Sequence, residues 1–155
     1  PPPRGGEPCL SGAPILLVED NPDDAFLARR ALRGCSVTAD LVVAASGEEA
    51  LSLLFQDSDA GPSALPKPVL VLLDLKLPGI DGVEVLRRIR ADARTRTLPV
   101  IVLSSSRAQQ DVAACYELGV NGFVQKAVDF DEFEESMKAL TAYWLRVNVS
   151  PRRLP

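Results

Sequence analysis

The sequence contains no histidine, and this absence excludes two common kinds of active site. Ser-His-Asp and Cys-His arrangements both need an imidazole as the general base. A zinc ion would find only cysteine and carboxylate ligands in this chain. Hydrolases that work through either arrangement are therefore excluded.

Cysteine and long apolar runs are also scarce. The three cysteines, Cys9, Cys35 and Cys115, are odd in number and form no CxxC pair. In a chain that is 46% hydrophobic, this pattern favours free thiols in a reducing compartment over a disulfide framework. No apolar run approaches the ~18 residues of a membrane span, and the Pro- and Gly-rich start lacks an apolar signal segment. We therefore expect a cytoplasmic protein that does not enter a membrane.

An excess of basic residues is missing as well. Lysine and arginine together number 17 against 21 acidic residues, which gives a net charge of −4. Three scattered pairs of arginines, at 29–30, 87–88 and 152–153, are typical of solvated helix faces. Nucleic-acid-binding domains usually carry a basic patch or stripe. We expect no nucleic acid partner.

What the chain does contain is a regular alternation of short apolar runs and amphipathic stretches. Its 155 residues fit one domain, which we place at 14–147, between a disordered tail at 1–13 and a C-terminal tail at 148–155. The runs predict strands at 14–19, 37–44, 68–73, 99–104 and 121–125, and helices at 22–33, 47–56, 82–91, 108–118 and 129–147. Such alternation predicts an α/β fold with a doubly wound, five-stranded parallel sheet and right-handed crossovers.

Several predicted helices begin with recognisable capping residues. Asn21 precedes Pro22, which suits the first helical position. Ser46, Asp81 and Asp129 each stand three residues before a glutamate, the spacing of a capping box. We interpret all of these residues as structural.

The last predicted helix carries a long apolar stripe. Its 19 residues would span roughly 28 Å, whereas a five-residue strand needs cover over only roughly 17 Å. We therefore expect the end around Tyr143, Trp144 and Leu145 to overhang the sheet and to favour contacts with a partner. The stripe consists of Phe130, Phe133, Met137, Leu140, Trp144 and Val147.

Three carboxylates are predicted at the ends of two strands. Asp74 closes the run Val69–Leu73, and Glu19 and Asp20 follow Ile15–Val18. Carboxyl ends of parallel strands are where open α/β sheets bind ligands. Three like charges within about 5 Å would each repel a neighbour by about 3 kcal/mol at an effective dielectric constant near 20. A hard cation such as Mg²⁺ would relieve this repulsion, although each acid alone could be an ordinary solvated loop residue.

Two further polar residues close predicted strands. Lys126 follows Phe123–Gln125, and its amine could bind a phosphoryl oxygen as a compact charge. Ser104 ends Val100–Leu103, and its hydroxyl could donate to the same group. Alone, Lys126 would be a surface lysine and Ser104 a turn former.

Taken together, these residues resemble the receiver domain of two-component response regulators. The resemblance spans about 14–147. It is carried by four motifs in the family's order, ILLVEDNPDD at 15–24, LLDLKLPGIDG at 72–82, LPVIVLSS at 98–105 and LGVNGFVQK at 118–126. It implies the flavodoxin-like receiver fold with an extended C-terminal helix.

The resemblance also implies roles for individual residues. Asp74 would be the phosphoacceptor, taking a phosphoryl group from a kinase phosphohistidine. Ser104 and Phe123 would be the switch hydroxyl and the switch aromatic, and Lys126 would bind the phosphoryl group. Mg²⁺, with Mn²⁺ as a substitute, would be held by Glu19, Asp20, Asp74 and the backbone carbonyl of Lys76.

The same resemblance predicts a signalling protein that is not an enzyme. Because only 148–155 follow the last helix, we expect a stand-alone regulator. Its opening motif and extended last helix are most similar to single-domain regulators paired with phytochrome histidine kinases. We expect such a kinase as partner, and a homodimer through the face that contains the last helix.

Two positions depart from the family's pattern. Ala127 stands where the family usually has proline, so we expect either a trans Lys126–Ala127 bond or a strained cis bond. Lys76 places a cation near the phosphorylation site, with an effect on phosphate lifetime whose direction the sequence does not give. Two alternatives stay open: a pseudo-receiver scaffold that works without phosphorylation, and a flavodoxin-type cofactor enzyme, which Glu19 and Asp20 disfavour because they would repel a phosphate.

Overall fold

The computed structural model describes residues 13–35, 39–56, 66–105 and 108–151. Its strands are β1 (Ile15–Val18), β2 (Leu41–Ala44), β3 (Leu70–Asp74), β4 (Val100–Ser104) and β5 (Gly122–Gln125). Its helices are α1 (Pro22–Arg33), α2 (Gly47–Leu54), α3 (Gly82–Ala91), α4 (Gln109–Glu117) and α5 (Phe130–Ala142). A π-helical turn, η1 (Tyr143–Val147), follows α5. The predicted N-terminal tail, except Ala13, lies outside the described residues.

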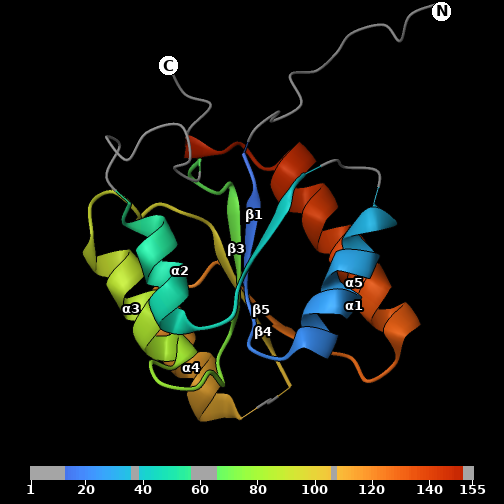
Figure 1. Cartoon of the computed structure of the whole chain (residues 1–155), viewed down its shortest axis with the longest axis horizontal. Coiled ribbons are helices and arrows are strands. Elements are labelled where there is room, and N and C mark those ends of the chain that lie inside the picture. Colours follow the sequence, from blue (N-terminus) through green and yellow to red (C-terminus); the bar gives the residue numbers. More distant parts are fainter. Residues whose placement is uncertain (1–12, 36–38, 57–65, 106–107, 152–155) are drawn as a thin grey trace, which may run out of the picture.

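All strand pairs are parallel, and the sheet has the order β2-β1-β3-β4-β5. Helices α2, α3 and α4 cover one face of the sheet, and α1 and α5 cover the other (Figure 1). This is the doubly wound, flavodoxin-like arrangement that the alternation and the resemblance predicted. The strand order reverses between β1 and β3, and this switch point is where open α/β sheets form a crevice at their carboxyl ends.

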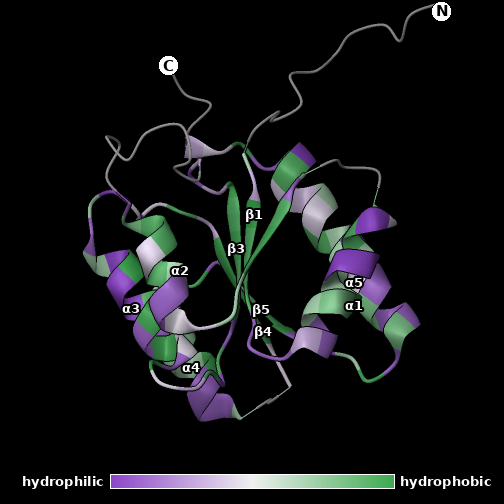
Figure 2. Cartoon of the chain, in the orientation of Figure 1, coloured by the Kyte–Doolittle hydropathy of each residue, from purple (hydrophilic) through white to green (hydrophobic). Residues whose placement is uncertain are grey.

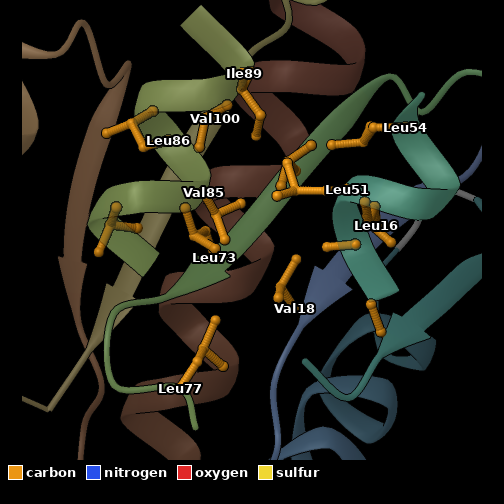
Figure 3. Close-up of a cluster of buried hydrophobic side chains, with 14 of the residues drawn as sticks. Leu16, Val18, Leu51, Leu54, Leu73, Leu77, Val85, Leu86, Ile89 and Val100 are labelled. Atoms are coloured by element: carbon orange, nitrogen blue, oxygen red, sulfur yellow. The ribbon is translucent and has the colours of Figure 1, made fainter. Parts of the chain in front are cut away.

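The central strands are nearly continuous apolar runs, and neighbouring side chains of a strand point to opposite sides of the sheet. Both faces of the sheet are therefore apolar. Leu16 and Val18 pack toward α2 and α3, whereas Ile15 and Leu17 pack toward α1 and α5. The strands are accordingly coloured mostly as hydrophobic, while polar residues are spread over the helices (Figure 2). Figure 3 shows the core between the sheet and helices α2 and α3. There Leu73 of β3 lies near Leu51 of α2 and near residues of α3. The labelled α3 residues there are Val85, Leu86 and Ile89.

The predicted caps are present, with one difference in each capping box. Asn21 accepts from the N–H groups of Asp23 and Asp24. Ser46 accepts from Glu49 N–H, but the Glu49 carboxylate binds the N–H of Ala45 instead of the cap residue. Asp81 caps Glu84 N–H, while the Glu84 side chain pairs with Arg87 and Arg88. Asp129 accepts from Asp131, one residue earlier than the spacing predicted.

The last helix differs from the prediction at its end. α5 stops at Ala142, and η1 contains the i→i+5 hydrogen bond of 2.7 Å from Asn148 N–H to the Tyr143 carbonyl. This wider turn shifts the apolar stripe by part of a turn, so Leu145 is buried and Val147 is 69% exposed. The predicted overhang is thus wrong for Leu145 and for Trp144, which is half-buried against the core. It holds for Tyr143, which is exposed. In the described part of the chain, no helix is long and apolar enough to cross a membrane.

Candidate functional site

Asp74 lies at the carboxyl end of β3, beside the end of β1. Because Val18 of β1 pairs with Leu73 of β3, the next residues, Glu19 and Asp74, reach the switch point together. Both residues are buried, whereas Asp20 is exposed. One carboxylate oxygen from each of the three lies within 4.8 Å of the others. The structure therefore brings the three predicted acids into one cluster with an open side toward solvent.

The cluster fits a hard divalent cation. All three side chains offer oxygen ligands, and the exposed side of Asp20 leaves room for water. Mg²⁺ favours oxygen ligands and keeps several waters, as this arrangement permits. The residues present therefore fit the predicted metal.

Lys126 reaches the same cluster from β5. Its backbone N–H donates to the Ser104 carbonyl at 2.8 Å, which ties the ends of β4 and β5 together. Its Nζ lies 2.9 Å from Glu19 Oε2, 3.2 Å from Asp24 Oδ2 and 3.3 Å from Asp74 Oδ2. The Lys126–Ala127 peptide bond is trans. The missing proline thus does not turn this lysine away from Asp74.

These charges perturb one another. Burial raises the pKa of Glu19 to about 7, opposed by its hydrogen bond to Lys126 and reinforced by Asp74. For Lys126, burial lowers the pKa, but the hydrogen bond to Glu19 and the charges of Asp74 and Glu19 outweigh it, so the pKa is raised above its usual value. The amine is therefore a stable cation inside a group of acids.

The remaining predicted residues lie on β4, on β5 and just after β3. Ser104 is buried at the end of β4, and its register partner on β5 is Gln125. Phe123 is half-buried against the core on the α4 side of the sheet. Lys76 has an exposed side chain, and its N–H donates to Asp74 Oδ1 at 3.3 Å.

The β3–α3 loop beside Asp74 is held by two contacts. Glu48 at the start of α2 accepts a 3.0 Å hydrogen bond from Ile80 N–H. Gly82 begins α3 so close to β3 that a Cβ there would lie 2.3 Å from the Asp74 carbonyl oxygen. Gly79 has a φ of +73°, which suits glycine. These contacts fix the backbone that carries Asp74 and Lys76.

The family model of the response regulator receiver domain matches residues 15–138. The chain belongs to the response regulator receiver family. Response regulator Rcp1 of Synechocystis sp. is 34% identical over 88% of this chain and 92% of its own length. This similarity covers nearly the whole of both proteins.

Solved structures of receivers agree with this fold. The phosphorylated cyanobacterial phytochrome response regulator RcpA has a TM-score of 0.82 at 34% identity, over 90% of this chain and 98% of its own. The Mn²⁺-bound form of Rcp1 has a TM-score of 0.80 at 34% identity, over 90% and 99%. The bacteriophytochrome response regulator AtBRR has a TM-score of 0.69 at 44% identity, over 88% and 98%.

One residue of the site was missed by the sequence analysis. Asp24 lies on the first turn of α1 and contacts the Lys126 amine. Its position could not be inferred from the strand ends, because Asp24 lies on a helix. The available signal was its place in the motif ILLVEDNPDD at 15–24, where it stands on the first turn of the helix that follows Glu19 and Asp20.

Proposed function

We propose that this receiver accepts a phosphoryl group on Asp74 from a sensor histidine kinase and changes its protein contacts in response. The observation that carries the proposal is the position of Asp74, buried at the switch point with two further acids and the Lys126 amine around it. An Asp74 carboxylate oxygen would attack phosphorus. The P–N bond to the kinase imidazole would break, and the imidazole would keep the electron pair and take up a proton.

Transfer of this kind depends on positioning and charge neutralisation more than on acid–base catalysis, so a chain without histidine can perform it. We assign the metal ligands to Glu19, Asp20, Asp74 and the Lys76 carbonyl. When bound, Mg²⁺ would supply positive charge against the repulsion between Asp74 and the incoming phosphoryl group. Lys126 would bind a phosphoryl oxygen.

Phosphorylation of Asp74 would change the conformation of residues on β4 and β5. A phosphoryl group adds negative charge and acceptor oxygens near the end of β4, which would draw the Ser104 hydroxyl toward Asp74. Phe123 lies on the neighbouring strand, where its register partner is Val102. Its rotation into space left by Ser104 would repack the face made by α4, β5 and α5.

We base the proposed partners on the similar proteins of known structure. RcpA and AtBRR are phytochrome and bacteriophytochrome response regulators, so we propose a phytochrome-type histidine kinase as the phosphodonor and the cytoplasm as the place of action. We propose that the receiver unit comprises 14–147 and acts as a regulator that is not itself an enzyme. We also propose a homodimer through the face that contains the last helix, where Tyr143, Val147 and Val149 are exposed.

The scaffold alternative rested on Ala127 in place of proline. Lys126 lies 3.3 Å from Asp74 despite this substitution, so the substitution itself does not favour a scaffold over a phosphoacceptor. The cofactor-enzyme alternative needs a phosphate-binding loop after β1. Glu19 and Asp20 occupy that position, and their negative charges would repel a phosphate.

Phosphotransfer from a purified phytochrome histidine kinase tests the proposal. The kinase, autophosphorylated with labelled ATP, is mixed with the wild type or Asp74→Asn in Mg²⁺. We expect label to move to the wild type and not to the variant. Transfer to both proteins at one rate would contradict the assignment.

A further inference from the structure

The Lys126 amine is bound on three sides by carboxylates. An ammonium group has three N–H donors, and here Glu19, Asp24 and Asp74 accept one each, at 2.9, 3.2 and 3.3 Å. The lysine side chain is only 17% exposed. Its position in the site is therefore defined by these three acids.

Packing alone does not hold this lysine. A cavity of about 60 Å³ lies beside it, between α1, the sheet and the start of α5. Ala127, which follows the lysine, is small and leaves this space open. The other apolar residues that line the cavity are Leu17, Leu27, Ala28, Leu103 and Phe133. The side chain of Lys126 is thus not fully enclosed by packing, and its ionic partners help to fix the amine.

Asp24 differs from the other two partners because it is not part of the metal cluster. It lies on the first turn of α1, where its N–H donates to the Asn21 cap. A bound cation would draw on the oxygens of Glu19 and Asp74, and a phosphoryl group would occupy an oxygen of Asp74, so these two residues would bind the amine less well. The Asp24 carboxylate would remain available to Lys126 in each case.

We propose that Asp24 is a positioning residue, which holds the Lys126 amine at the phosphoryl site from the side of α1. This inference rests on the proposed phosphorylation of Asp74 and goes beyond it by adding a residue outside the family's acid pair. Asp24 would act through Lys126 and would touch neither the metal nor the phosphoryl group.

The test compares Asp24→Ala with Asp23→Ala. Asp23 is the neighbouring exposed acid of the same helix turn, so both variants lose one negative charge from the first turn of α1. The initial rate of phosphorylation by acetyl phosphate is measured in saturating Mn²⁺, and the Kd for Mn²⁺ is measured by calorimetry. We expect the rate of Asp24→Ala to fall roughly tenfold, as when an outer partner of a site ligand is lost. Its Kd should change by no more than about threefold, and Asp23→Ala should match the wild type in both.

A double variant identifies the route of the effect. If Asp24 acts through Lys126, Asp24→Ala should cause no further loss of rate in a Lys126→Ala background. Equal rates for Asp24→Ala and Asp23→Ala, or a full additional loss in the Lys126→Ala background, would overturn this inference while wild-type labelling still supports the phosphoacceptor. A wild type that takes no label, with either acetyl phosphate or the kinase, would overturn both proposals.

Discussion

Glu19 is the buried member of the acid pair, and its protonation should control metal binding. Burial raises its pKa to about 7, so the metal-free protein holds a proton on Glu19 below pH 7, and a divalent cation must displace it. The Kd for Mn²⁺ should therefore weaken by about tenfold for each pH unit below 7 and should level off above pH 8. Calorimetric titrations between pH 6 and pH 8.5 measure this slope.

Glu19→Gln is the control for this titration. It removes the proton that the metal displaces, so the variant should bind Mn²⁺ more weakly with a shallower pH dependence. A wild-type Kd that is constant over the same range would contradict the assignment of Glu19 as a ligand.

Gly82 is the residue whose replacement should most directly disturb the backbone at Asp74. A Cβ there would lie 2.3 Å from the Asp74 carbonyl oxygen and 2.6 Å from Leu75 Cα. Because both neighbours are backbone atoms, Gly82→Ala should lower the free energy of unfolding by about 1–3 kcal/mol, the usual cost of overpacking. Urea denaturation measures the change.

Gly34→Ala provides the comparison. A Cβ at this position would have Glu134 Oε1, at the end of a flexible side chain, as its nearest neighbour, at 3.3 Å. The φ of Gly34, −76°, suits alanine. Its free energy of unfolding should change by less than about 1 kcal/mol. Equal losses in the two variants would show that the close approach at Gly82 is not a constraint.

At the scale of elements, the π-helical turn η1 determines which residue of the last stripe is buried. Leu145 is 6% exposed and packs in the core beneath α1 and α5, whereas Val147 is 69% exposed. Leu145→Ala should therefore lower the free energy of unfolding by about 2–4 kcal/mol. Val147→Ala should change it by about 0.5 kcal/mol or less. A regular helix through 147 would reverse this order, and thermal and urea unfolding of the two variants would distinguish the cases.

The elements also show where prediction from sequence works. α1 and α3 begin and end at the predicted residues, because Asn21 and Asp81 supply local caps whose chemistry is visible in the sequence. The π-helical turn at the end of the last helix was not predicted, because such a turn has no comparable local signature. Its i→i+5 hydrogen bond shows only in three dimensions.

Within the site, the positions of five residues could be predicted, because the carboxyl ends of parallel strands lie at one edge of the sheet. These residues are Glu19, Asp20, Asp74, Ser104 and Lys126. Asp24 was not predicted, since its role depends on how α1 packs against α5 and the sheet.

For the whole molecule, the exposed apolar residues around η1 are the basis of the proposed dimer. Tyr143, Val147 and Val149 are all about half exposed or more. Sedimentation velocity at tens of micromolar protein should show a dimer, and a Tyr143→Glu, Val147→Glu variant should shift it toward monomer, since a charge in an apolar interface is unfavourable. A monomeric wild type, both with and without phosphorylation, would contradict the proposed interface.

The central claim is that the chemistry of this receiver takes place on Asp74. The most direct measurement is peptide mapping by mass spectrometry after incubation with acetyl phosphate and Mg²⁺, with Asp74→Asn treated in parallel. We predict a single phosphoryl group on the wild type, within the peptide that contains Asp74, and no phosphoryl group on the variant. Phosphorylation at any other residue of the wild type, or equal modification of Asp74→Asn, would contradict it.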